Sequence, residues 1–170
     1  IETHRDMQIP DEATIVALKR YFSERGIATS AGITVTIDES DDFKTYCYSD
    51  PFYRNKLKEV VELSAKHFEE IVFDDFFFTN CKCPKCIASK GTRSWTDFRL
   101  ALMTQASREL VLDPAKAVNP KVEVVIKYPN WYDHFQGLGF NLMDQPPMYD
   151  GVYTGNETRD AAHGAQHLQP

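Results

Sequence analysis

Short apolar segments alternate along this chain with amphipathic segments of helical period, and this alternation limits the possible folds more than any other feature. The predicted order of elements is β, α, β, α, β, α, β, α, β, and the first strand lies in "IETHRD". The last helix in this order is replaced by a shorter aromatic segment. The other predicted strands span Ile27 to Ile37, Ile71 to Phe78, 122–128 and Tyr149 to Thr154. The predicted helices run from about Pro10 to Arg25, from Asp50 to Phe68 and from Ser94 to near Asp113-Pro114, with a further helix beginning after Thr154.

This order predicts a parallel sheet with right-handed crossovers, either doubly wound or part of a barrel. Polar residues at the ends of all five predicted strands favour the barrel, because its strands end at one common mouth. No glycine-rich phosphate loop follows a strand, as a doubly wound nucleotide-binding sheet would show. The length of 170 residues predicts a single domain. Since a complete barrel needs about 200 residues or more, we expect this domain to be an incomplete (β/α)8, TIM-barrel-like catalytic domain of about five βα units, truncated at both ends.

Composition excludes two classes of partner. The chain has 19 basic and 25 acidic residues, a formal net charge of -6, and no dense cluster of Lys and Arg, so nucleic acid is not an expected partner. No apolar run approaches the roughly 18 residues of a membrane span.

Two adjacent aspartates, Asp74 and Asp75, stand in "FDDFFF" at the end of a predicted strand. Next to a carboxylate and among phenylalanines, one carboxyl group is expected to have a raised pKa, as a general acid requires. Asp75 is the first choice, on the expectation that Phe73 shares its interior-facing side. The alternative is that one Asp caps a loop and the other meets solvent.

A second catalytic carboxylate is predicted at Glu157, in "YTGNETRD" after the fifth strand. The alternative is that Glu157 lies in the first turn of a helix and complements its dipole.

The four cysteines form one pattern, with Cys81, Cys83 and Cys86 in C-x-C-x2-C and Cys47 in the loop before the preceding helix. In a parallel barrel these two loops are neighbours, so four thiolates would suit a closed, structural zinc site that leaves no position for catalytic water. Two disulfides or unbonded thiols are the alternatives.

A cysteine after one strand, followed by a carboxylate-bearing strand end and C-x-C-x2-C, resembles the (β/α)8 domain of family 42 β-galactosidases and related clan A glycoside hydrolases. The resemblance implies that Asp74-Asp75 occupies the acid/base position of the fourth strand, where that family has Asn-Glu, and that the cysteines correspond to its zinc cluster. It also implies that the nucleophile sits on the seventh strand, outside this chain. The Asp-Asp pair further resembles the substrate-assisted hexosaminidases of family 84.

The resemblance implies a glycosidase that acts on an oligo- or polysaccharide. Aromatic and charged residues at strand ends agree with this, and the predicted substrate-binding residues are Glu2, Arg5, Asp6, Lys127, Tyr128 and Trp131. Trp131 would alternatively pack in the core of a short helix. Two other classes of protein fit the sequence. One is a zinc-braced carbohydrate-binding barrel without activity, and the other is a metal-dependent hydrolase that uses His4, His134 or His163.

Overall fold

A five-stranded parallel sheet organises the computed structural model, which describes residues 1–41, 44–129 and 135–155. The strands lie in the order β1, β2, β5, β6 and β7, so each pairs in parallel with the next strand of the sheet along the chain. This sequential order is consistent with part of a (β/α)8 barrel, whereas a doubly wound sheet reverses its order at a switch point. The strand bounds are β1 Glu2–His4, β2 Ala31–Ile33, β5 Glu70–Phe73, β6 Glu123–Tyr128 and β7 Gly151–Thr154.

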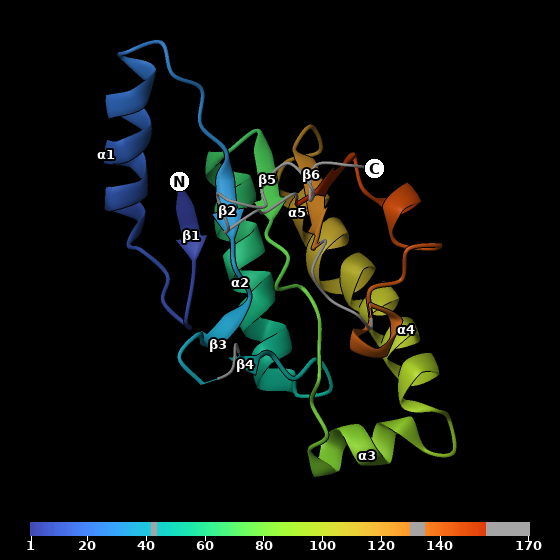
Figure 1. Cartoon of the computed structure of the whole chain (residues 1–170). Helices are drawn as coiled ribbons and strands as arrows, with labels where there is room; N and C mark the ends of the chain where they lie inside the picture. Colours follow the sequence, from blue (N-terminus) through green and yellow to red (C-terminus); the bar gives the residue numbers. More distant parts are fainter. Residues whose placement is uncertain (42–43, 130–134, 156–170) are drawn as a thin grey trace, which may run out of the picture.

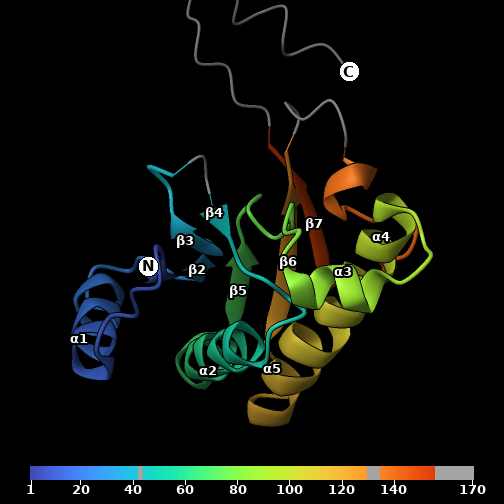
Figure 2. The same cartoon turned by 90° about the horizontal axis from the view of Figure 1, so that it is seen from below.

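The long helices lie on one side of the sheet, as Figures 1 and 2 show. They are α1 (Glu12–Ser23), α2 (Pro51–His67) and α4 (Trp95–Ala106), which continues into the shorter α5 (Asp113–Val118). Their starts follow from side-chain caps, since Asp50 accepts a hydrogen bond from the amide of Phe52 and Ser94 accepts one from the amide of Asp97. Helices on one face only are again consistent with a partial barrel.

The third predicted helix does not end near Pro114, and that prediction is wrong. A π-helical turn, η1 (Ser107–Leu112), joins α4 to α5, and the amide of Asp113 bonds the carbonyl of Arg108, five residues back. Pro114 therefore stands in the first turn of α5, where its missing N–H group costs little. The wider turn absorbs a proline that would break a regular α-helix.

Two predicted strands are shorter in the structure. The segment from Ile27 to Ile37 is split, because the chain bends after β2 and forms β3 (Thr36–Asp38), which pairs in antiparallel fashion with β4 (Lys44–Thr45). The strand from Ile71 ends at Phe73 rather than Phe78, because a turn begins at Asp75.

Short helices fill two of the remaining connections. An unpredicted helix, α3 (Pro84–Lys90), follows the cysteine cluster, and the described part of the aromatic segment holds only 3₁₀ turns, η2 (Gln136–Leu138) and η3 (Pro146–Met148). The helix expected after Thr154 lies outside the described residues.

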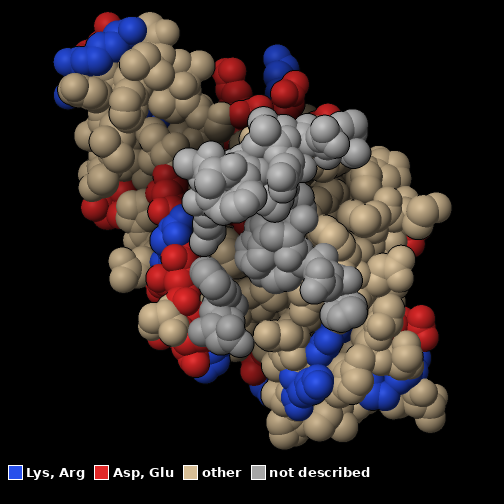
Figure 3. Space-filling model, in the orientation of Figure 1, with Lys and Arg blue, Asp and Glu red and all other residues tan. Residues whose placement is uncertain are grey.

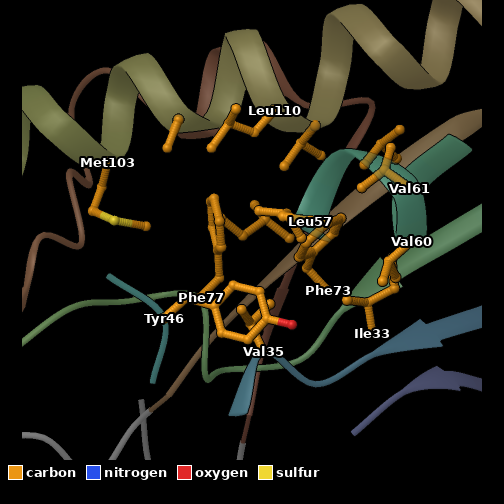
Figure 4. Close-up of a cluster of buried hydrophobic side chains, with 14 of the residues drawn as sticks. Ile33, Val35, Tyr46, Leu57, Val60, Val61, Phe73, Phe77, Met103 and Leu110 are labelled. Atoms are coloured by element: carbon orange, nitrogen blue, oxygen red, sulfur yellow. The ribbon is translucent and has the colours of Figure 1, made fainter. Parts of the chain in front are cut away.

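The hydrophobic core lies between the sheet and the helices (Figure 4). Phe73 of β5 and Ile126 of β6 are fully buried there, together with Leu57 of α2. Because successive strand residues face opposite sides, Val125 and Lys127 of β6 face away from the helices. The opposite face of the sheet is therefore where polar groups gather.

Replacing Phe73 by Ala is expected to lower the free energy of unfolding by about 3–5 kcal/mol, the usual cost of deleting a fully buried aromatic side chain. Phe52→Ala is the matched control, since Phe52 is 61% exposed on α2 and its loss should cost less than about 0.5 kcal/mol. Urea denaturation of both variants measures the difference. Equal effects would show that Phe73 is not a core residue.

Candidate active site

The two aspartates follow β5, the central strand of the sheet. Asp74 extends the strand by one residue, because its amide donates to the carbonyl of Ile33 in β2, so its side chain lies on the face opposite Phe73. Asp75 begins the turn and is only 2% exposed. Because the chain turns at Asp75, strand alternation no longer applies there and does not place Asp75 on the side of Phe73. The ring of Phe73 packs toward α2 (Figure 4).

Lys127 of β6 joins the two carboxyl groups. Its Nζ lies 2.9 Å from Oδ1 of Asp74, as a hydrogen bond, and 3.6 Å from Oδ2 of Asp75. The amide of Asp75 also donates to Oδ1 of Asp74, at 2.9 Å. The contact crosses from one strand to its neighbour, because the register pairs Phe73 with Ile126, one residue before each partner.

The pKa of Asp74 is lowered from its ordinary value. Burial alone would raise it, but the hydrogen bond from Lys127 and those from the backbone and side chain of Asp75 lower it overall. Asp74 is therefore suited to remain a carboxylate, which is the opposite of what a general acid needs.

A second polar group follows β1 and lies over β1 and β3, where Figure 3 shows acidic and basic side chains close together. Arg5 Nε donates to Oε1 of Glu2 at 2.6 Å, and a second guanidinium nitrogen pairs with Glu39. The hydrogen bond with Glu2 is the main reason that the pKa of Arg5 is raised, and the charge of Asp74 contributes. Glu2 and Arg5 also line a hollow of about 310 Å³ that opens at this end of the sheet.

Two predicted substrate-binding residues have other contacts. Asp6 ties the chain to the β3–β4 hairpin, since its amide donates to Oγ1 of Thr36 and its Oδ1 accepts from the amide of Glu39, both at 3.1 Å. Tyr128 is 4% exposed in the core, where its ring packs against Phe140. Trp131 and Glu157 lie outside the described residues.

His4 has a role in packing that the sequence does not reveal. Its Nδ1 is 2.6 Å from the carbonyl oxygen of Thr34 and its Nε2 is 2.6 Å from the hydroxyl of Tyr46, so both ring nitrogens are engaged. Burial lowers the pKa of His4, which favours the neutral ring. These contacts do not favour His4 as a metal ligand; His134 and His163 lie outside the described residues.

The four cysteines meet as the spacing predicts. Their Sγ atoms all lie within 4.8 Å of one another, with Cys47 at 3.6 Å from Cys83 and 3.5 Å from Cys86. No disulfide joins any of these four described residues. Ligands around a tetrahedral zinc, with Zn–S bonds of about 2.3 Å, are separated by about 3.8 Å, so the cluster fits such an ion.

The surroundings of the thiols differ. Burial raises the pKa of Cys47, and it raises that of Cys86 to about 11. At Cys83 a backbone hydrogen bond from Cys86 lowers the pKa to about 7, so one thiolate ligand is available near neutral pH. The cluster ties the loop before α2 to the segment that follows Asp75.

Parallel α/β domains carry their sites at the carboxyl ends of the strands, and two carboxyl groups lie at that end of the central strand here. The thiol cluster lies in the loops before α2 and α3 and in the first turn of α3. The family model described as "Probable glycosyl hydrolase, catalytic domain" matches residues 1–170, and the chain belongs to this family.

One curated relative shares this chain's sequence over nearly its whole length. The uncharacterized protein SSO3021 of Saccharolobus solfataricus is 30% identical over 198 aligned positions, which cover 99% of this chain and 33% of that protein. The chain thus spans about a third of the length of its relative. No solved structure matches. Within the described residues, none of the helices is long and apolar enough to cross a membrane.

Proposed function

We propose that this chain carries the general acid/base of a glycoside hydrolase, with Asp75 as the proton donor and Asp74 as the carboxylate that orients it or the substrate. The observation that carries this is the buried Asp75 next to an Asp74 whose ionised form Lys127 stabilises. Two adjacent carboxyl groups in different environments are the arrangement by which one acid stays protonated while its neighbour is charged.

The domain is proposed to be part of a (β/α)8 barrel. Support comes from the sequential parallel strands, the helices on one face and the polar groups in or directly after β1, β5 and β6. A second carboxylate at Glu157 of this chain, or a nucleophile on a strand outside it, would complete the catalytic pair. Glu2 and Arg5, at the hollow beside β1, and Trp131 are proposed to contact the sugar.

Zinc is proposed as a structural ion held by Cys47, Cys81, Cys83 and Cys86. Four thiolates would fill its coordination sphere, so the ion would brace two loops and would not activate water. Lys85, whose pKa is raised chiefly by its hydrogen bond with Asp50 and in part by Cys47 and Cys83, adds positive charge beside the cluster.

The substrate is proposed to be an oligo- or polysaccharide. The Asp-Asp pair also favours a second version of the mechanism, in which Asp74 orients a 2-acetamido group of the substrate and this group attacks in place of an enzyme nucleophile. The contact of Lys127 with both carboxyl groups supports this version, because it couples an orienting carboxylate to the acid.

This proposal is tested by incubating the full-length protein with aryl glycosides that carry either a 2-acetamido or a 2-hydroxyl group. Hydrolysis of either class supports a glycosidase, and hydrolysis of the 2-acetamido class alone supports the substrate-assisted version. Saccharide binding without hydrolysis of any member would instead indicate a carbohydrate-binding barrel and would contradict the proposed activity.

A further inference from the structure

Lys127 lies deeper in the structure than a typical lysine. Its side chain is 13% exposed, and its ammonium group touches both Asp74 and Asp75. The Asp74 side chain is 31% exposed and the Asp75 side chain only 3%. Three ionisable groups therefore lie together in a largely buried place, with the ammonium group of Lys127 in contact with both carboxyl groups.

One proton decides the charge of this group. If both aspartates were ionised, two adjacent negative charges would repel each other in a largely buried place, which is costly. The two carboxyl groups belong to adjacent residues and contact the same ammonium group, so a proton on one of them removes the repulsion between them. The shorter contact to Lys127 and the greater exposure both favour the charge on Asp74 rather than on Asp75.

We propose that Lys127 is a positioning residue that fixes the proton on Asp75, by holding Asp74 as the carboxylate. This inference rests on the proposed function for its catalytic meaning, but the location of the proton is a property of the folded protein alone. Arg5, after β1, adds positive charge toward Asp74, and its partners Glu2 and Glu39 offset that charge.

Gly155 provides an independent observation. A Cβ atom at this position would lie 2.9 Å from Cε and 3.6 Å from Nζ of Lys127, too close for the present path of the lysine chain. The amide of Gly155 is held by the carbonyl of Tyr128, at 2.9 Å, so the backbone does not yield easily. Gly155 therefore leaves the space through which Lys127 reaches the aspartates, and Gly155→Ala should displace the ammonium group without removing its charge.

The test is infrared difference spectroscopy of the aspartate carboxyl bands against pH in the full-length protein, with the bands assigned by Asp74→Asn and Asp75→Asn. Lys127→Met is expected to raise the pH at which Asp74 loses its proton by about 1–3 units. Lys127→Arg should restore most of the shift, and Gly155→Ala should reproduce part of it. Lys116→Met is the matched control, because Lys116 pairs with Asp150 at 2.8 Å elsewhere on the sheet and its loss should leave the Asp74 band in place.

The inference would be overturned if the pH at which the Asp74 band changes were the same in a folded Lys127→Met protein. A proton found on Asp74 in the unsubstituted protein would also overturn it. The measurement needs no substrate, so it separates two failures. If the bands behave as expected but no glycoside is hydrolysed, only the proposed function fails. If glycosides are hydrolysed and the bands do not move, only the role of Lys127 fails.

Discussion

Asp75→Asn in the full-length protein is expected to lower kcat/KM for an unactivated disaccharide by about 10²–10⁴-fold, the usual contribution of general acid/base catalysis. The amide keeps the size of the side chain but cannot donate the proton that a poor leaving group needs. Initial rates of sugar release measure the effect.

The matched control is Asp150→Asn, which breaks another Lys–Asp ion pair on the same sheet, before β7, away from the aspartate pair. It should keep nearly full activity. Urea denaturation of both variants shows whether either change acts through folding. Unchanged kcat/KM in a folded Asp75→Asn protein would show that Asp75 is not the acid.

Removal of the proposed zinc is the second change with a large expected effect. Structural zinc binds zinc-finger peptides with about 10–16 kcal/mol, as much as the whole stability of a domain, about 5–15 kcal/mol. We therefore expect a strong chelator to unfold the segment 81–86 and to lower the melting temperature, because the thiols there would lose their common ligand. Elemental analysis should give one zinc per chain.

Cys86→Ser tests the same site without a chelator, since Cys86 is 1% exposed and its Sγ lies 3.5 Å from that of Cys47. It should lose zinc and stability together. Ser89→Ala, at an exposed position of α3, is the matched control and should change neither. Purified protein without zinc, in which all four thiols react freely with a thiol reagent, would contradict the zinc proposal.

Local signals predicted the parallel sheet and most helix starts. Asp50 before Pro51, and Ser94 three residues before Asp97, both cap helices as their spacing indicates. The helix that continues past Pro114 could not be predicted in this way, because the π turn depends on packing of the whole α4–α5 segment. The end of β5 at Phe73 could have been predicted from sequence, since Asp74 and Asp75 interrupt the apolar run and aspartate favours turns over strands.

The candidate site was predicted only in part. The sequence placed Asp74, Asp75 and Lys127 at strand ends, but the contact between them depends on the register of β5 against β6, which is a tertiary property. The sequence alone predicts that Lys127 and Tyr128 have different environments, because adjacent strand residues face opposite sides of a sheet and only one of them reaches the polar face. The cysteine cluster was predictable, since spacing alone brings three of its four members together.

The central claim, that Asp75 protonates the leaving group of a glycoside, is tested most directly by one ratio. It is the loss of kcat/KM in Asp75→Asn on an unactivated disaccharide divided by the loss on an aryl glycoside whose leaving group needs no proton. The proposed role predicts a ratio of about 10² or more, because only the first substrate depends on the acid. Equal losses on both substrates, or no loss on either, would contradict it.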